Sequence, residues 1–214
     1  MQPDTSYELL TIFRDGGFMM LPLVLCSLIA LGVIIAKMWT LVVAHRESQR
    51  LLEDIRSLGT GGHIGAAIQK AEETRGPVAA ILLAGLMRVQ GRHTGKDIEK
   101  AISTTGSIEL DFLERGLVVL ATIANVAPML GFLGTVIGMI SAFAAIEAAG
   151  QVEPALVASG IKVALITTAA GLTIAIPVNV FYNFFVTRVD TLIADMEKGA
   201  QAVLDLIWRS EMAA

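Results

Sequence analysis

The feature that most constrains this chain is the stretch from Gly116 to Ile146, thirty-one residues without one charged side chain. A helix rises about 1.5 Å per residue, so a helix of this length would span about 46 Å, more than the ~30 Å hydrocarbon core of a bilayer. Arg115 and Glu147 bracket the stretch with charge. It therefore predicts a membrane-crossing helix with a turn or two to spare.

Small residues recur every three or four positions in the second half of this stretch, and Thr135 lies beside them. They are Gly131, Gly134, Gly138, Ala142 and Ala145. Small residues at this spacing share one helix face and let helices approach closely in lipid, where packing holds helices together. We therefore expect this helix to be surrounded by other helices, with a hydroxyl group held at depth.

Two further uncharged stretches, 18–36 and 163–187, contain nineteen and twenty-five residues, and 54% of the chain is hydrophobic. An ordinary soluble domain has no use for such runs. The chain has no basic patch with interleaved aromatic residues, which argues against nucleic-acid binding. Cys26 lies inside the first run and is expected to be a packing residue. The three histidines lack the spacing of metal ligands.

The fold class predicted is an all-α integral membrane protein with three transmembrane helices and long cytoplasmic helical extensions. Thr94 is expected to begin one long helix that continues through the second membrane stretch. The predicted segments are an external amphipathic N-terminus (1–17), a first membrane helix (18–44), a cytoplasmic helical domain (45–115), a second membrane helix (116–146), an external hairpin (147–154), a third membrane helix (155–187) and a cytoplasmic C-terminal helix (188–214).

The distribution of positive charge predicts the orientation. The segments 45–115 and 188–214 hold thirteen of the sixteen Lys and Arg residues, whereas the hairpin holds none. The positive-inside rule places these two segments in the cytoplasm, with the N-terminus outside and the C-terminus inside.

The chain shows no catalytic triad, phosphate-binding loop or metal cluster, so we expect neither an enzyme nor a bound cofactor. The remaining candidates for chemistry are hydroxyl groups at membrane depth: Thr135 in the second membrane helix, and Thr167 and Thr168 in the third. Counting from the hairpin places Thr135 and Thr168 within about 5 Å of the same height. The third helix also carries small residues around its threonines, namely Gly160, Ala164, Gly171 and Ala175.

Two interpretations of these threonines stay open at this point. Such hydroxyls often only donate to a carbonyl of the preceding turn. Alternatively they position water, sodium or a partner's carboxylate, although they cannot themselves hold a proton at neutral pH. A proton path would need a titratable group, and Lys162 is the nearest that this chain offers.

Two segments resemble signatures of a known family. APMLGFLGTVIGMISAF (127–143) and GIKVALITTAAGLTIAIPVNVFYN (160–183) are similar to the second- and third-helix signatures of the MotA/TolQ/ExbB proton-channel family. The Gly16-Gly17 pair, followed by a helix with Met and Pro, also fits, and three spans place the chain nearer to the ExbB/TolQ branch.

The resemblance implies a homopentamer in the bacterial inner membrane, whose second and third helices line a central pore. It implies a single-span ExbD/TolR-like partner, whose membrane aspartate is the titrating group, and a TonB/TolA-like protein that receives the mechanical work. Thr135 and Thr168 match the two pore threonines of the family. The small residues Gly131, Gly134, Gly138, Gly160, Ala164 and Gly171 are then pore-helix packing positions.

The chain departs from the family at one position. Many members carry glutamate in the third-helix motif G-I-x-E-A-L, where this chain has Val163, preceded by Lys162. Lys162 either extends to the membrane interface or contributes to a ring of positive charge at the outer mouth of the pore. The coupling ion, proton or sodium, stays open. The leading hypothesis is a channel-forming stator. The alternatives are a non-conducting scaffold for partner helices and a channel that needs no partner.

Overall fold

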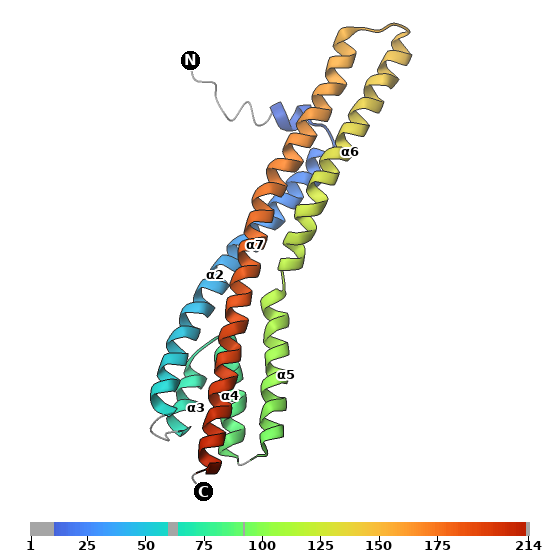
Figure 1. The fold of residues 1–214 in the computed structure, drawn as a ribbon. Coiled ribbons are helices and arrows are strands. Elements are labelled where there is room, and N and C mark those ends of the chain that lie inside the picture. The colour runs from blue at the N-terminus through green and yellow to red at the C-terminus, as the bar shows by residue number, and fades with distance from the viewer. Residues whose placement is uncertain (1–10, 60–63, 92, 213–214) are drawn as a thin grey trace, which may run out of the picture. The chain divides into compact units, whose positions relative to one another are not determined.

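The computed structural model describes residues 11–59, 64–91 and 93–212, and all regular structure in these ranges is helical. Residues 1–10 of the predicted N-terminal segment lie outside the described residues. The helices are α2 (Met20–Gly59), α3 (Ile64–Glu73), α4 (Pro77–Gln90), α5 (Gly95–Glu114), α6 (Leu117–Ala149) and α7 (Pro154–Met212) (Figure 1).

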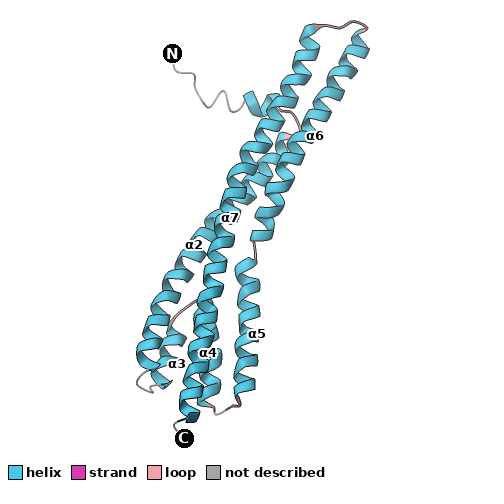
Figure 2. Cartoon of the chain, in the orientation of Figure 1, coloured by secondary structure: helices cyan, strands magenta, loops and turns pink. Residues whose placement is uncertain are grey.

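Three helical stretches are long and apolar enough to cross a membrane, within Met20–Ile55, Gly95–Ala149 and Pro154–Asp205. Figure 2 shows that helices make up nearly all of the described chain, with short connections between them. The architecture is that of an all-α, multi-pass membrane protein.

The chain divides into two compact units. The first unit comprises residues 1–35 and 116–183, and the second comprises residues 36–115 and 184–214. The helices α2 and α7 each contribute residues to both units.

In the first unit, α6 and α7 contact each other backbone to backbone. A Cβ atom on Gly131 would lie 2.9 Å from the carbonyl oxygen of Thr167, and one on Gly171 would lie 2.6 Å from the carbonyl oxygen of Ala127. Real Cβ atoms essentially never come so close to backbone, so only glycine fits at these two positions. The two pairs also show that α6 and α7 run antiparallel. We call the small residues of this contact the glycine seam, and all of them are buried: Gly131, Gly134, Gly138, Gly160, Ala164 and Gly171.

The connection between α6 and α7 is shorter than the predicted hairpin 147–154. Helix α6 continues to Ala149, and Gly150 caps it with a φ of 67°. Glycine adopts this left-handed conformation without a Cβ clash. Helix α7 then begins at Pro154, a residue that suits the first turn because it has no N–H group to satisfy. Only residues 150–153 are therefore non-helical.

The prediction of one continuous helix from Thr94 through the second membrane stretch is wrong. Helix α5 does begin at Gly95, with Thr94 as its N-cap, but it ends at Glu114. Gly116 then takes a left-handed φ of 87° before α6 starts. An uncharged run does not reveal this break, because a glycine that turns the chain looks the same in sequence as one that continues a helix.

Lys37 contacts the helix end that this break creates. Its Nζ atom donates a hydrogen bond of 2.9 Å to the carbonyl oxygen of Leu113, in the last turn of α5. Carbonyl groups in a last turn lose their intrahelical donors, and a lysine side chain can replace them. Lys37 therefore ties α2 to α5 within the second unit.

The second unit is a helical bundle with an apolar core, in which α4 packs against α3 and α5. Helix-period apolar positions explain why these segments fold together. The fully buried side chains of this core include Leu51, Ile55, Leu82, Leu86, Ile98, Leu192 and Val203.

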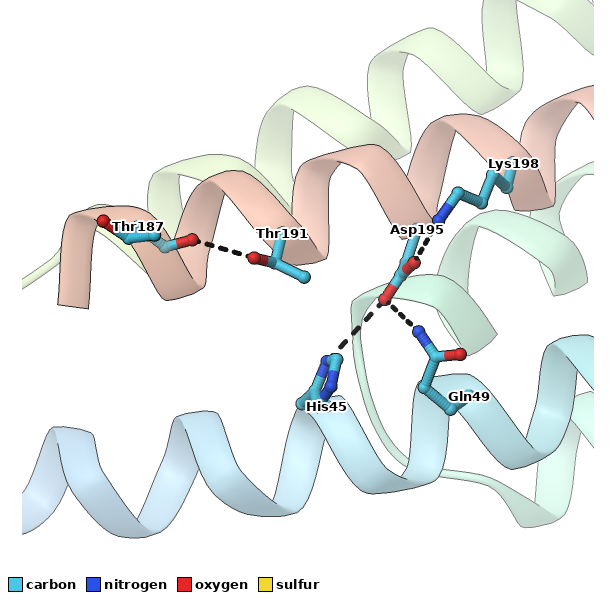
Figure 3. A network of polar contacts seen from close by, with 6 residues as sticks. All are labelled: His45, Gln49, Thr187, Thr191, Asp195 and Lys198. Atoms are coloured by element: carbon cyan, nitrogen blue, oxygen red, sulfur yellow. Dashed lines mark hydrogen bonds and ion pairs between the residues drawn. The ribbon is translucent and has the colours of Figure 1, made fainter. Parts of the chain in front are cut away.

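One carboxylate is enclosed in this bundle. Asp195 on α7 is 1% exposed, and it accepts hydrogen bonds from Gln49 Nε2 at 2.8 Å and from Lys198 Nζ at 2.9 Å. His45 Nδ1 lies 3.7 Å from the same carboxylate (Figure 3). A buried charge is costly unless it is paired and hydrogen-bonded, and these partners from two helices meet that need.

The sequence contains a signal that Asp195 is buried, which the apolar residues of the stripe do not give on their own. The tail 188–214 has an apolar stripe that includes Leu192 and Met196, both buried. Asp195 lies three residues after Leu192 and one before Met196, so it shares the buried face of the helix. An acidic residue on such a stripe indicates a paired, enclosed carboxylate.

The glycine seam leads to a first prediction. Gly171→Ala should lower the free energy of unfolding by about 1–3 kcal/mol, because the added methyl group collides with the Ala127 carbonyl oxygen and forces the helices apart. The measurement is the thermal unfolding midpoint of the detergent-solubilised protein. Gly32→Ala is the matched control, since a Cβ there would meet nothing within 4 Å. Equal midpoints for the two variants would contradict the backbone contact.

The Asp195 network leads to a second prediction. Asp195→Ala should destabilise the protein by about 1–3 kcal/mol, because it leaves buried polar partners without their acceptor. Asp190→Ala serves as control, since Asp190 is exposed on the same helix. Unfolding followed by circular dichroism should separate the two variants, and a neutral Asp195→Ala would show that the network contributes no stability.

Candidate functional site

The threonine predicted on α6 lies next to the glycine seam. Thr135 follows the buried Gly134, is itself partly exposed, and donates its hydroxyl proton to the carbonyl oxygen of Phe132 at 2.6 Å. One hydroxyl has one proton to donate and two lone pairs that accept. Within this chain the hydroxyl proton is donated to the same helix, and the oxygen lone pairs stay available to a further donor.

The two threonines predicted on α7 differ in their surroundings. Thr167 is fully buried and donates to the carbonyl oxygens of Val163 and Ala164, both at 3.0 Å. A Cβ atom on Gly134 would lie 2.5 Å from the Thr167 Cβ atom, so this side chain fills the space that the glycine leaves. Thr167 is therefore part of the contact between α6 and α7 rather than a group facing open space.

Thr168 links the two helices. It is partly buried, and its hydroxyl group donates to the carbonyl oxygen of Gly131 across the helix contact at 3.4 Å. Gly131 lies opposite Thr168, and Gly138 lies opposite Gly160. Interpolating this register places Thr135 four to five residues, or about 6–7 Å, from Thr168 along the helix axes. The fold thus holds two hydroxyl groups little more than one helical turn apart on two helices in backbone contact.

A cavity of about 360 Å³ lies in the first unit, near the end of the unit where α6 leads into α7. We call it the outer cavity. Its walls include Gly138, Ser141, Ser159 and Val163, and residues 16–19 also line it. Val163, where the family resemblance implies a glutamate in many members, presents an apolar group to this cavity. The serine hydroxyls are the polar side chains of its lining in the described chain.

Lys162 has an acidic partner that the sequence does not predict. Its Nζ atom forms an ion pair with the carboxylate of Asp15. Asp15 belongs to the helical turn 11–15, directly before the Gly16-Gly17 bend, where Gly17 has a φ of 66°. Opposite charges separated by 147 positions in the chain leave no periodic signal. The ion pair joins the N-terminal turn to α7 beside the outer cavity.

Comparisons with known proteins identify the family to which this chain is similar. Residues 73–198 match the model of the MotA/TolQ/ExbB proton channel family, and this range contains the glycine seam and all three threonines. A biopolymer transport protein ExbB homolog from Methanothermobacter thermautotrophicus is 36% identical over 141 residues, which cover 66% of this chain and 49% of that protein.

Two further relatives match this chain over 172 and 100 residues. An ExbB-like 3 biopolymer transport protein from Synechocystis is 30% identical over 172 residues, covering 79% of this chain and 81% of that protein. The Tol-Pal system protein TolQ from Haemophilus influenzae is 40% identical over 100 residues, covering 47% of this chain and 44% of that protein. The chain thus spans about half the length of some relatives and most of another. Because the family model covers more than half of the residues and relatives carry the names ExbB and TolQ, the chain belongs to the MotA/TolQ/ExbB proton channel family, in its ExbB/TolQ branch.

Proposed function

We propose that this chain is a transport component rather than an enzyme: the channel-forming stator of a complex that converts protonmotive force into mechanical work. It would assemble as a homopentamer in the bacterial inner membrane and share its pore with an ExbD/TolR-like single-span partner. The work would pass to a TonB/TolA-like protein. The observation that carries this proposal is the pair Thr135 and Thr168, held little more than one helical turn apart beside the glycine seam.

The chemistry of the two hydroxyl groups supports this role. Each now donates to a carbonyl oxygen, so each can accept a hydrogen bond from a protonated carboxyl group or from water. Rotation about the C–O bond lets the same hydroxyl donate to the carboxylate after its proton has left. A group that serves both protonation states lowers the cost of carrying a carboxyl group through a membrane.

The titrating carboxyl group has to come from another chain. The stretches 116–146 and 163–187 contain no charged residue, and Lys162 and Asp15 at the edge are paired with each other. A partner helix with an aspartate at membrane depth would supply the missing group. The present chain would then form the walls of the pore, and the partner would carry the proton.

A second candidate function is a non-conducting scaffold for partner helices. Val163 favours it, because this side chain lines the outer cavity, at a position where the resemblance implies a glutamate in many family members. An apolar wall there would weaken hydration of an ion entering from that side.

Ion flux in proteoliposomes tests the proposal. The protein is reconstituted with and without its ExbD/TolR-like single-span partner. Flux is measured first under a pH gradient and then under a sodium gradient. Proton flux should require the partner and fall about 10- to 100-fold in Thr135→Ala and Thr168→Ala, the loss expected for a hydrogen bond to a charged group. Thr168→Ser, which keeps the hydroxyl group, should retain most of the flux.

Two exposed threonines on the same helices are matched controls. Thr122 on α6 and Thr173 on α7 donate only to carbonyl oxygens of their own helices, at 2.8 Å each, so their alanine variants should conduct normally. Full flux in the Thr135→Ala/Thr168→Ala double variant would refute the role of the hydroxyl pair. A complete absence of flux for either ion, with the partner bound, would favour the scaffold.

A further inference from the structure

The second unit contains a cavity of about 180 Å³ between α2 and α7. We call it the arginine cavity. Its walls include Leu41 and Val42 from α2 and Phe184 and Phe185 from α7, and its cationic lining residues include Arg46 and Arg188. None of the residues that line it is acidic.

The apolar and the charged lining of the arginine cavity follow the same order on both helices. Gln49 bonds to Asp195, and a Cβ atom on Gly199 would lie 3.7 Å from Leu52, so α2 and α7 run in the same direction here. Residue numbers therefore rise together along the two helices. Within each helix the apolar lining precedes the arginine, and this register sets Arg188 level with Val42, about one turn (about 6 Å) before Arg46.

Both guanidinium groups are available to a ligand. Arg46 and Arg188 are exposed, and neither forms an ion pair with a carboxylate of the described chain. The Arg188 guanidinium carbon lies 5.2 Å from the centre of the Phe184 ring, which orients the group over the cavity wall. Two unpaired cations at the mouth of one apolar cavity favour an anionic ligand with an apolar portion.

The residues that line the arginine cavity lie near the ends of the uncharged stretches, at the boundary between hydrocarbon and lipid headgroups. Arg188 is the first charged residue after the twenty-five uncharged residues 163–187. On α2, the exposed Trp39 precedes Arg46 by two turns, and tryptophan is enriched at the level of lipid headgroups. On α2 the first charged residue after the uncharged stretch 18–36 is Lys37, so the cavity, lined by residues 38–46 and 184–188, lies where both helices pass from the hydrocarbon into the headgroup region. Its lower-numbered residues lie on the side of the acyl chains.

We propose that the arginine cavity binds an anionic phospholipid of the surrounding bilayer. The phosphate lies between Arg46 and Arg188, because guanidinium groups match phosphate oxygens with paired hydrogen bonds. An acyl chain lies against Leu41, Val42 and Phe184. This inference rests on the membrane assignment of α2 and α7 and does not require that the protein conducts ions.

Lipid binding to the detergent-purified protein tests the proposal. Native mass spectrometry, with thermal unfolding as a second readout, compares phosphatidylglycerol with phosphatidylcholine of the same acyl chains. Phosphatidylglycerol should bind at least about tenfold more tightly, and the R46Q/R188Q variant should lose this preference, because charge-assisted hydrogen bonds supply it. Val42→Trp, which enlarges an apolar side chain of the cavity lining and keeps both arginines, should also weaken binding.

Arg115→Gln is the matched control. Arg115 is exposed, borders the uncharged stretch 116–146 and does not line the arginine cavity. If the lipid were held only by general attraction to positive charge, Arg115→Gln would weaken binding as much as Arg46→Gln. Wild-type binding that does not distinguish the two lipids would overturn the proposal. Inorganic phosphate that displaces phosphatidylglycerol at millimolar concentration would overturn the lipid assignment, and equal losses in Arg115→Gln and Arg46→Gln would reduce the site to surface charge.

Discussion

The close contact between the backbones of α6 and α7 is the constraint on which the first unit depends. Lipid provides no hydrophobic drive for two apolar helices to associate, so the contact must come from packing. Glycine at 131 and 171 lets each helix approach a carbonyl oxygen of the other. That approach leaves Thr167 as filler in the seam, brings Thr168 within hydrogen-bond reach of the Gly131 carbonyl oxygen, and places Thr135 little more than one helical turn away.

Charge is kept out of this contact and gathered at its edges. The stretches 116–146 and 163–187 carry none, and the charged pair Lys162 and Asp15 lies beside the outer cavity. The second unit tolerates one enclosed carboxylate, Asp195, because partners from two helices satisfy it. Arg46 and Arg188 of the same unit line the arginine cavity together with apolar side chains. The first unit thus keeps charge at the edge of its helix contact, whereas the second encloses a carboxylate among hydrogen-bonding partners.

Much of the architecture could be predicted because the physical signals are long and local. Uncharged runs predict membrane helices, and glycine spacing predicts the face on which α6 and α7 meet. The break at Gly116 and the short loop at Gly150 could not be predicted in the same way, since each depends on one backbone dihedral angle that periodicity does not record. The three threonines, equivalent in sequence, also proved different: one fills the seam, one bridges the helices, and one bonds to its own turn.

The sequence by itself determined the helical class, the segments able to cross a membrane and the small-residue face, because hydropathy and helical period act over neighbouring residues. Only the tertiary structure decided which polar groups meet. Asp15 with Lys162, Lys37 with the end of α5, Asp195 with Gln49, and Arg46 beside Arg188 each join residues far apart in the chain. Such pairs depend on the register between helices. That register is set by the side-chain volumes of the whole contact surface, and no single stretch of sequence contains it.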